Sequence, residues 1–232
     1  MDRPSRHVSA LADDRQDELR REYDRRFSAR ADYRDAVWRI LVDLVFQPYV
    51  PESGTVLELG CGWGEFINHV RAARRIGMDL NPDSRARLQP GVEFLHQDCA
   101  EAWPVADETL DAVFTSNFFE HLPDKASLAR TLRHTLRCLK PGGLLICLGP
   151  NIRYLHGRYW DFWDHYIPLT EKSLVEVLEL TGFAIERTVA RFVPYTMSGR
   201  RNPPLWTVRV YLQLPSLWSI LGEQFLVIGR KP

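Results

Sequence analysis

The stretch Val56-Leu57-Glu58-Leu59-Gly60-Cys61-Gly62-Trp63-Gly64 decides the expected fold. An apolar run of strand length leads directly into a loop with three glycines, and a helix is predicted to begin near Glu65. Glycine lets the backbone turn tightly, and main-chain N–H groups at a helix start point towards a ligand. A GxGxG loop is weakly specific by itself, because it also occurs as a packing turn and differs from the dinucleotide pattern GxGxxG.

Apolar runs of strand length recur along the chain after this loop and alternate with helical segments. The predicted strands are 56–59, 75–79, 92–95, 110–114, 144–148 and 225–228, and the clearest predicted helices are 66–74, 127–139 and 171–181. Strands that alternate with helices and short turns are typical of a mostly parallel sheet with helices on both faces. The sequence therefore predicts an α/β fold.

Composition narrows the class of protein. The 232 residues suit one α/β domain, and Lys plus Arg balance Asp plus Glu at 30 each, so no broad basic surface for nucleic acid is expected. The 4 cysteines form no CxxC pair, and residues 1–18 contain no apolar run of a secretory signal. We therefore expect no disulfide framework and a cytoplasmic location.

Polar residues follow three of the predicted strands at near-equal intervals. Asp79 ends the second strand, Asp98 ends the third, and Asn117 follows the fourth. The carboxyl ends of parallel strands meet at one edge of a sheet, where open α/β sheets bind their ligands, and a carboxylate after the second strand suits ribose hydroxyls. This coincidence is more specific than the glycine loop alone.

Taken together, these motifs resemble the class I S-adenosylmethionine-dependent methyltransferases over residues 55–182. The motifs that carry the resemblance are 56–64, Gly77-Met78-Asp79-Leu80, Gln97-Asp98-Cys99, Leu110-Asp111-Ala112-Val113 and Leu139-Lys140-Pro141-Gly142-Gly143. The resemblance implies S-adenosylmethionine as the cofactor. It also implies a Rossmann-like, seven-stranded, mostly parallel sheet whose last strand is antiparallel.

The resemblance also implies a set of cofactor-binding residues. Gly60 and Gly62 would lie under the cofactor, Asp79 would hold the ribose, Asp98 would read the adenine, and Asn117 would face the methionine portion. The full predicted set is Glu58, Gly60, Cys61, Gly62, Asp79, Leu80, Asp98, Cys99 and Asn117. Carboxylates suit a sulfonium cation, whereas NADP favours an arginine after the second strand. NAD or a nucleotide stays an alternative, although no P-loop motif is present.

Two histidines are candidate general bases for a hydroxyl acceptor. His121 follows the fourth strand, and His165 lies in an aromatic segment after the fifth strand. A neutral imidazole suits proton abstraction near pH 7, with Asp161 or Asp164 to orient it. The alternatives are a helix start at His121 and a packed aromatic lid around His165. Asp161, Asp164 and His165 also suit a divalent metal, but their spacing is not diagnostic and we assign no metal site.

These features predict O-methylation of a hydroxyl on a small molecule or glycan. The aromatic segment 154–166, with its opening at Pro150, resembles methyltransferases of cell-surface glycan and natural-product pathways. Methylation of nucleic acid or of glutamine amides is not expected, because no Asn/Asp-Pro-Pro-aromatic motif follows the fourth strand. The alternatives are N- or C-methylation of a small molecule, and a non-catalytic cofactor-binding scaffold or regulatory subunit.

The predicted organisation is a helical cap at 1–50 and a methyltransferase domain at 51–232. The cap covers one edge of the sheet or, alternatively, places Tyr23, Phe27 or Arg34 over the cofactor. Within the domain we expect an aromatic lid at 153–168 and an apolar insertion at 203–222 that is too interrupted to span a membrane. The insertion packs beside the last strands, forms a homodimer contact, or touches a membrane that carries a lipid-linked acceptor.

Overall fold

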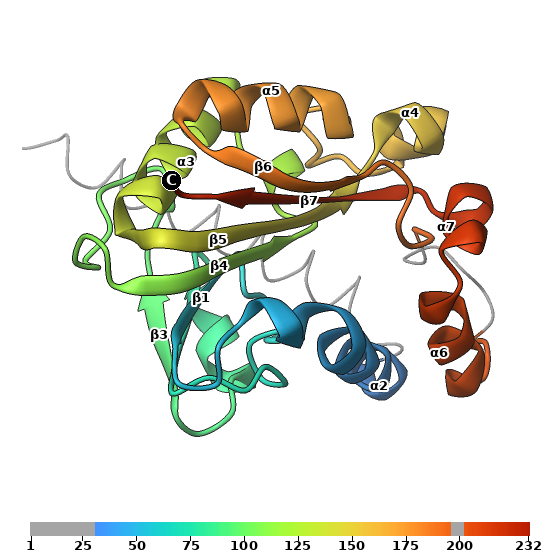
Figure 1. Cartoon of the computed structure of the whole chain (residues 1–232), viewed down its shortest axis with the longest axis horizontal. Coiled ribbons are helices and arrows are strands. Elements are labelled where there is room, and N and C mark those ends of the chain that lie inside the picture. Colours follow the sequence, from blue (N-terminus) through green and yellow to red (C-terminus); the bar gives the residue numbers. More distant parts are fainter. Residues whose placement is uncertain (1–30, 196–201) are drawn as a thin grey trace, which may run out of the picture.

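The computed structural model describes residues 31–195 and 202–232 (Figure 1). Its centre is a seven-stranded sheet in the order β3-β2-β1-β4-β5-β7-β6. The strands are β1 (Thr55–Leu59), β2 (Arg74–Asp79), β3 (Val92–His96), β4 (Leu110–Ser116), β5 (Leu139–Pro150), β6 (Ala184–Val189) and β7 (Gln224–Arg230). The first five strands pair in parallel, and β7 runs antiparallel to both β5 and β6. The predicted Rossmann-like fold class is confirmed.

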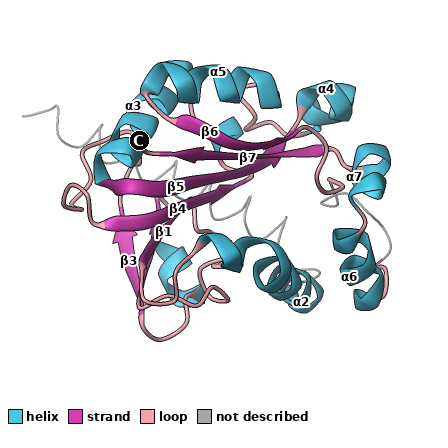
Figure 2. Cartoon of the chain, viewed as in Figure 1, coloured by secondary structure: helices cyan, strands magenta, loops and turns pink. Residues whose placement is uncertain are grey.

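Helices cover both faces of this sheet. They are α2 (Ala31–Leu41), α3 (Lys125–Cys138), α4 (Ile152–Leu155), α5 (Glu171–Thr181), α6 (Leu205–Gln213) and α7 (Pro215–Leu221), and α2 continues through a π turn at Val42–Phe46 and a 3₁₀ turn at Gln47–Tyr49. Further 3₁₀ turns lie at Pro82–Arg87, Phe119–His121 and His156–Asp161. Figure 2 shows α3 and α5 over one face, α2 on the opposite face, and α6 and α7 beyond the strand ends.

Alternating side chains of the strands divide the core into two layers. In β4, Val113 faces the layer that contains α3 and α5, whereas Ala112 and Phe114 face the layer that contains α2, α6 and α7. Successive side chains of a strand point to opposite faces, so a strand buried on both sides must be apolar throughout. This is why the strands read as continuous apolar runs in the sequence.

The predicted helix at 66–74 is wrong. The structure has only turns at 65–69, and β2 already begins at Arg74. The amides of Asn68 and Val70 do reach the carbonyls four residues back, but this turn is not continued. The Arg74 amide donates to the Gly54 carbonyl at 3.2 Å, and the chain enters β2 at this residue.

The later elements follow the predicted pattern closely. The helix predicted at 171–181 is α5, which Thr170 and Ser173 cap at its start and Gly182 ends with φ of 111°. The insertion predicted at 203–222 forms α6 and α7. The segment directly before α6 is joined to α2 by a hydrogen bond from the Tyr33 hydroxyl to the Pro203 carbonyl at 2.7 Å. Across residues 31–195 and 202–232, no helix is both long and apolar enough to cross a membrane.

Candidate functional site

The glycine loop after β1 has the backbone shape that only glycine adopts readily. Gly60, Gly62 and Gly64 have φ values of 63°, 49° and 75°. These left-handed conformations crowd the β-carbon of other residues. A β-carbon on Gly60 would also lie 2.3 Å from a ring carbon of Phe118, which covers the loop at this point. The loop predicted from the sequence is therefore formed, with Phe118 as a neighbour that the sequence did not reveal.

Two buried carboxylates hold this loop in place. Asp79, at the end of β2, accepts the Gly62 amide at 2.7 Å and the Asn81 amide at 2.8 Å. Glu58 accepts the Ile67 amide, and its side chain is buried. Burial raises the pKa of Glu58 well above its usual range, and the negative charges of Glu65 and Asp79 add to this effect. A raised pKa favours the neutral, protonated form of Glu58, so this side chain serves the loop through its hydrogen bond rather than through a negative charge.

Asn117 presents a hydrogen-bond acceptor at the end of β4. Its backbone has φ of 47°, and its amide nitrogen donates to the Ser116 hydroxyl at 2.9 Å. The Oδ1 atom is buried and has no hydrogen-bond partner among the described residues. A buried acceptor without a donor costs about 1–3 kcal/mol, so this atom fits a bound group that carries N–H bonds.

The side chains of the other predicted cofactor residues contact groups close to them in the fold or are exposed. Asp98, half-buried after β3, accepts the Ala100 amide at 2.8 Å, and Leu80 exposes 39% of its surface. Cys61 is buried against Gly77, where a β-carbon would lie 2.9 Å from its sulfur. Cys99 is buried as well and accepts the Thr131 hydroxyl at 3.3 Å. We expect both cysteines to contribute through their backbone, because their thiols are committed to packing.

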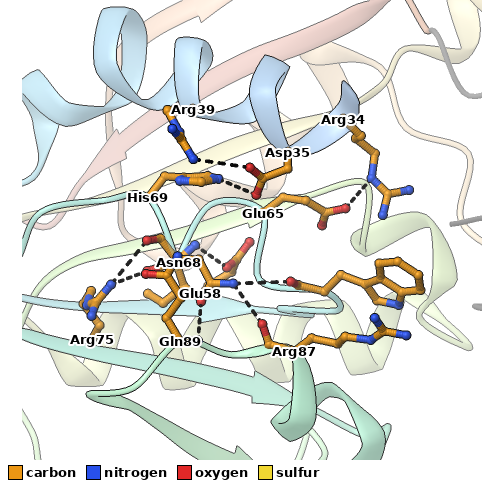
Figure 3. A network of polar contacts seen from close by, with 12 residues as sticks. Arg34, Asp35, Arg39, Glu58, Glu65, Asn68, His69, Arg75, Arg87 and Gln89 are labelled. Atoms are coloured by element: carbon orange, nitrogen blue, oxygen red, sulfur yellow. Dashed lines mark hydrogen bonds and ion pairs between the residues drawn. The ribbon is translucent and has the colours of Figure 1, made fainter. Parts of the chain in front are cut away.

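Charged residues join the cap to the glycine loop (Figure 3). Arg34 of α2 pairs with Glu65 at 2.5 Å, and Asp35 pairs with His69 at 2.8 Å. Burial raises the pKa of Glu65 although the Arg34 charge opposes the rise. Of the cap residues predicted to lie over the cofactor, Arg34 therefore contacts the loop, whereas Tyr23 and Phe27 lie outside the described residues.

Trp63 at the tip of the loop lies between two guanidinium groups. The Arg34 group is 5.4 Å from the Trp63 ring centroid and the Arg87 group is 4.0 Å from it. Each cation over an indole face contributes about 0.5–1 kcal/mol at an exposed site. Asn68, which follows the glycine loop, holds the segment that contains Arg87. Its side chain donates to the Arg87 carbonyl at 3.0 Å and accepts the Gln89 amide at 2.8 Å.

We expect Arg34→Ala to lower the free energy of unfolding by about 2 kcal/mol, because it leaves the Glu65 carboxylate buried without its cation. Urea denaturation measures the effect. The double variant Arg34→Met with Glu65→Gln should lie closer to the wild type, since it removes both charges together. Arg39→Ala is the matched control, because Arg39 is exposed and its pair with Asp35 at 3.6 Å is weak. Equal losses in Arg34→Ala and Arg39→Ala would contradict the prediction.

The tertiary structure brings the two predicted histidines together. Their ring centroids are 5.0 Å apart in an edge-to-face arrangement. His121 lies in the turn after β4, with Nδ1 at 2.9 Å from the carboxylate of Asp164. His165 is 5% exposed, with Nδ1 at 2.9 Å from the Tyr159 carbonyl. Both candidate bases therefore occupy one site beside the end of β4.

The electrostatics of the two histidines differ. Burial disfavours the charged form of His121, but the Asp164 hydrogen bond and the charges of Glu120 and Asp164 outweigh it and raise the His121 pKa. Of the two aspartates expected to orient a candidate base, Asp164 pairs with His121, whereas Asp161 is exposed.

Glu120 belongs to the site but was missed as a candidate in the sequence. Its side chain is 3% exposed, and it offers a ligand atom within 4.8 Å of those of His121 and His165. Its carbonyl accepts the amides of Tyr166 at 2.7 Å and Ile167 at 3.2 Å, which joins the turn after β4 to the aromatic segment. A glutamate directly before a histidine at a strand end was the available signal.

The aromatic segment is partly core and partly surface. Tyr159 is fully buried, and its hydroxyl donates to the Ile167 carbonyl at 2.6 Å. In contrast, Trp160, Trp163 and Tyr166 are 56%, 84% and 55% exposed. The exposed rings adjoin the histidine site along the chain and are available to a ligand, which agrees with a lid but does not test it.

A family model described as a methyltransferase domain matches residues 23–188, which is most of the chain. The chain belongs to this methyltransferase family. Its recognition as a class I S-adenosylmethionine-dependent methyltransferase is thereby confirmed, and S-adenosylmethionine is the cofactor of the family. The buried Asn117 acceptor fits this cofactor, which carries an ammonium group with N–H bonds.

Two relatives and one solved structure illustrate the similarity. A probable S-adenosylmethionine-dependent methyltransferase of Mycolicibacterium smegmatis is 34% identical over 59% of this chain and 54% of its own length. Trans-aconitate 2-methyltransferase of Azoarcus is 32% identical over 51% of this chain and 48% of its own. The chain thus spans about half the length of these methyltransferase relatives. A methyltransferase structure from Archaeoglobus fulgidus, 22% identical, shares the fold with a TM-score of 0.63 over 85% of this chain and 94% of its own.

Proposed function

We propose that this methyltransferase-family chain transfers a methyl group from S-adenosylmethionine to a hydroxyl of a small molecule or glycan. The observation that carries the proposal is the pair of histidines beside the end of β4, with His121 oriented by Asp164. Transfer to a hydroxyl needs a group that removes its proton, whereas transfer to an amine or a reactive carbon relies more on alignment. An oriented imidazole pair is suited to the first of these reactions.

The residues of the glycine loop and the strand ends would hold the cofactor. Asp79 and Asp98 offer acceptors for the ribose and adenine, and the Asn117 oxygen offers an acceptor for the ammonium group. When bound, the cofactor supplies an electrophilic methyl group. Glu58 would hold the Ile67 amide and keep the loop in shape.

The histidines would handle the acceptor proton. Because Nδ1 of His121 faces the Asp164 carboxylate, the neutral imidazole carries its proton on Nδ1 and accepts the hydroxyl proton on Nε2. The raised pKa makes His121 a stronger base in its neutral form. His165 is held in the same way by the Tyr159 carbonyl and is the second candidate for this role.

The exposed rings of the aromatic segment favour a sugar or an aromatic acceptor. Trp160 and Trp163 present large apolar faces on which a sugar ring can stack. The name of the Azoarcus relative specifies a different acceptor, trans-aconitate, so the acceptor class is proposed from the site of this chain. A cell-surface glycan or natural-product pathway and a cytoplasmic location stay predictions.

The experiment measures release of S-adenosylhomocysteine with a panel of hydroxylated sugars, phenols, amines and carboxylic acids. Turnover with a hydroxyl acceptor supports the proposal. Turnover with an amine only, kept in both His121→Ala and His165→Ala, would favour the N-methyltransferase alternative. Cofactor binding without turnover on the whole panel would favour a non-catalytic scaffold.

The α6–α7 apolar surface supports contact with a membrane that carries a lipid-linked acceptor. We define it by six exposed apolar side chains: Leu205, Trp206, Val210, Leu214, Ile220 and Leu221. Across residues 202–222 the only charged residue is Arg209. The end of α7 lies beside the lid, since Arg191 donates to the Gly222 carbonyl at 2.7 Å and lies 4.7 Å from the Tyr154 ring centroid. A surface at this place can take part in delivering an acceptor with a lipid tail.

We expect the wild type to cosediment with vesicles of phosphatidylcholine and phosphatidylglycerol. The double variant Trp206→Ser with Ile220→Ser should lose most of this binding. Removing two large exposed apolar side chains removes much of the area that enters the lipid interface. Leu180→Ser is the matched control, because Leu180 is 81% exposed on α5. A different result would identify the surface as a homodimer contact: the wild type does not bind vesicles and is a dimer in light scattering, whereas the double variant is a monomer.

A further inference from the structure

Three metal-ligating side chains meet at the histidine site. Glu120, His121 and His165 each place one ligand atom within 4.8 Å of those of the other two. Glu120 and His165 are buried, whereas His121 exposes 26% of its side chain. Two imidazoles and one carboxylate with access from one side resemble the ligand sets of open zinc sites.

A short hydrogen-bonded scaffold holds the three ligands together. Glu120 and His121 lie in the turn after β4, and His165 lies in the aromatic segment. The Tyr166 and Ile167 amides donate to the Glu120 carbonyl at 2.7 and 3.2 Å, so backbone bonds join the two segments beside the ligands themselves. A preformed scaffold lowers the ordering cost of metal binding.

Each histidine also has the outer partner that metal-bound histidines require. Nδ1 of His121 faces the Asp164 carboxylate at 2.9 Å, and Nδ1 of His165 faces the Tyr159 carbonyl at 2.9 Å. These acceptors place the imidazole proton on Nδ1, so the lone pair of each neutral ring lies on Nε2. A ligating histidine commonly donates its other N–H to a carboxylate or carbonyl, which fixes the ring and raises its basicity.

We propose that Glu120, His121 and His165 form a binding site for a divalent transition-metal ion such as Zn²⁺. The ligands are Nε2 of both histidines and the carboxylate of Glu120, with the fourth position open on the side of His121. Ligand atoms of tetrahedral Zn²⁺ lie about 3.4 Å apart for bonds of about 2.0–2.1 Å, so the ligand atoms must approach one another by up to about 1.4 Å. Nitrogen ligands select against Mg²⁺ and Ca²⁺.

The proposed metal site differs from the one considered in the sequence and gives the two histidines a second role. The sequence-based expectation of a metal placed Asp161 and Asp164 among the ligands without assigning a site, whereas in the fold Asp164 supports His121 from behind and Glu120 takes its place. The same Nε2 atoms would bind the metal and accept the acceptor proton. Metal occupancy therefore competes with the proposed base role and should inhibit turnover, but binding itself does not depend on that role.

Calorimetric titration of ZnCl₂ into the chelator-treated full chain, without cofactor or acceptor, tests the site. We expect one Zn²⁺ per chain with a dissociation constant in the micromolar range or below, and no heat from MgCl₂. His121→Ala, His165→Ala and Glu120→Gln should each weaken binding at least tenfold. His134→Ala is the matched control, since His134 lies in α3 and should leave binding unchanged.

Circular dichroism checks that each variant is folded. If a variant of buried Glu120 or His165 unfolds, the test rests on His121→Ala, because His121 is partly exposed. Absence of Zn²⁺ binding by the wild type, or binding that survives all three substitutions, overturns the site. The second outcome would point to the four cysteines, which are free thiols. Turnover is measured on the metal-free chain. Zn²⁺ binding by a chain that shows no turnover when metal-free would leave the site standing while the proposed methyl transfer fails, and turnover without Zn²⁺ binding would do the reverse.

Discussion

Asp79→Ala is expected to weaken S-adenosylmethionine binding at least about 100-fold, which corresponds to about 2.8 kcal/mol. The carboxylate of Asp79 accepts the Gly62 and Asn81 amides, so its loss releases the glycine loop as well as the acceptor proposed for the ribose. Two buried amides left without partners cost about 1–3 kcal/mol each. Isothermal titration calorimetry with S-adenosylmethionine measures the affinity directly.

Two further variants separate the roles of Asp79. Asp79→Asn keeps one acceptor oxygen and should bind more tightly than Asp79→Ala, though more weakly than the wild type. Asp83→Ala is the matched control, because Asp83 is exposed at the same edge of the sheet. Wild-type affinity in a folded Asp79→Ala chain would show that the cofactor lies elsewhere, and the placement of the whole cofactor site would then fail.

His121→Ala and His165→Ala are expected to reduce turnover of a hydroxyl acceptor by about 10²–10⁴, because a positioned general base contributes on this order. The affinity for S-adenosylmethionine should stay near the wild-type value, since neither side chain belongs to the predicted cofactor set. Steady-state release of S-adenosylhomocysteine gives the first quantity and calorimetry the second. The larger loss identifies the base.

Asp164→Asn refines this assignment. The carboxylate of Asp164 pairs with His121, so this variant should reduce turnover strongly if His121 is the base. His134→Ala serves again as the control with unchanged turnover. If both histidine variants keep full activity with a hydroxyl acceptor, the proton leaves by another route and the base assignment is wrong.

Much of the fold was predictable because the sheet is buried on both faces. Strands such as β4 carry apolar side chains towards both core layers, which makes them visible as continuous apolar runs. The helix predicted at 66–74 failed for a reason that local pattern cannot contain. Arg74, the last residue of that prediction, is the first residue of β2 and pairs with Thr55 of β1, so a contact between separate segments decides its conformation.

The residues of the candidate site were likewise only partly predictable from the sequence. Asp79 and Asn117 were found because parallel strands place their carboxyl ends at one edge, so the order of strands along the chain locates them. Glu120 was missed, and the choice of histidine that Asp164 meets was left open, because no spacing rule relates the turn after β4 to the aromatic segment. Their relation is set by hydrogen bonds between two segments far apart in sequence.

The sequence by itself therefore determined the class of fold and the glycine loop, since both depend on short-range pattern and on strand order, and its resemblance to a known family implied the cofactor. Only the tertiary structure decided that the glycine loop is held by Asp79 and covered by Phe118, and that Glu120, His121 and His165 form one cluster. The physical reason is that local periodicity reports which face of an element is buried, whereas long-range packing selects the particular partner that each polar side chain meets.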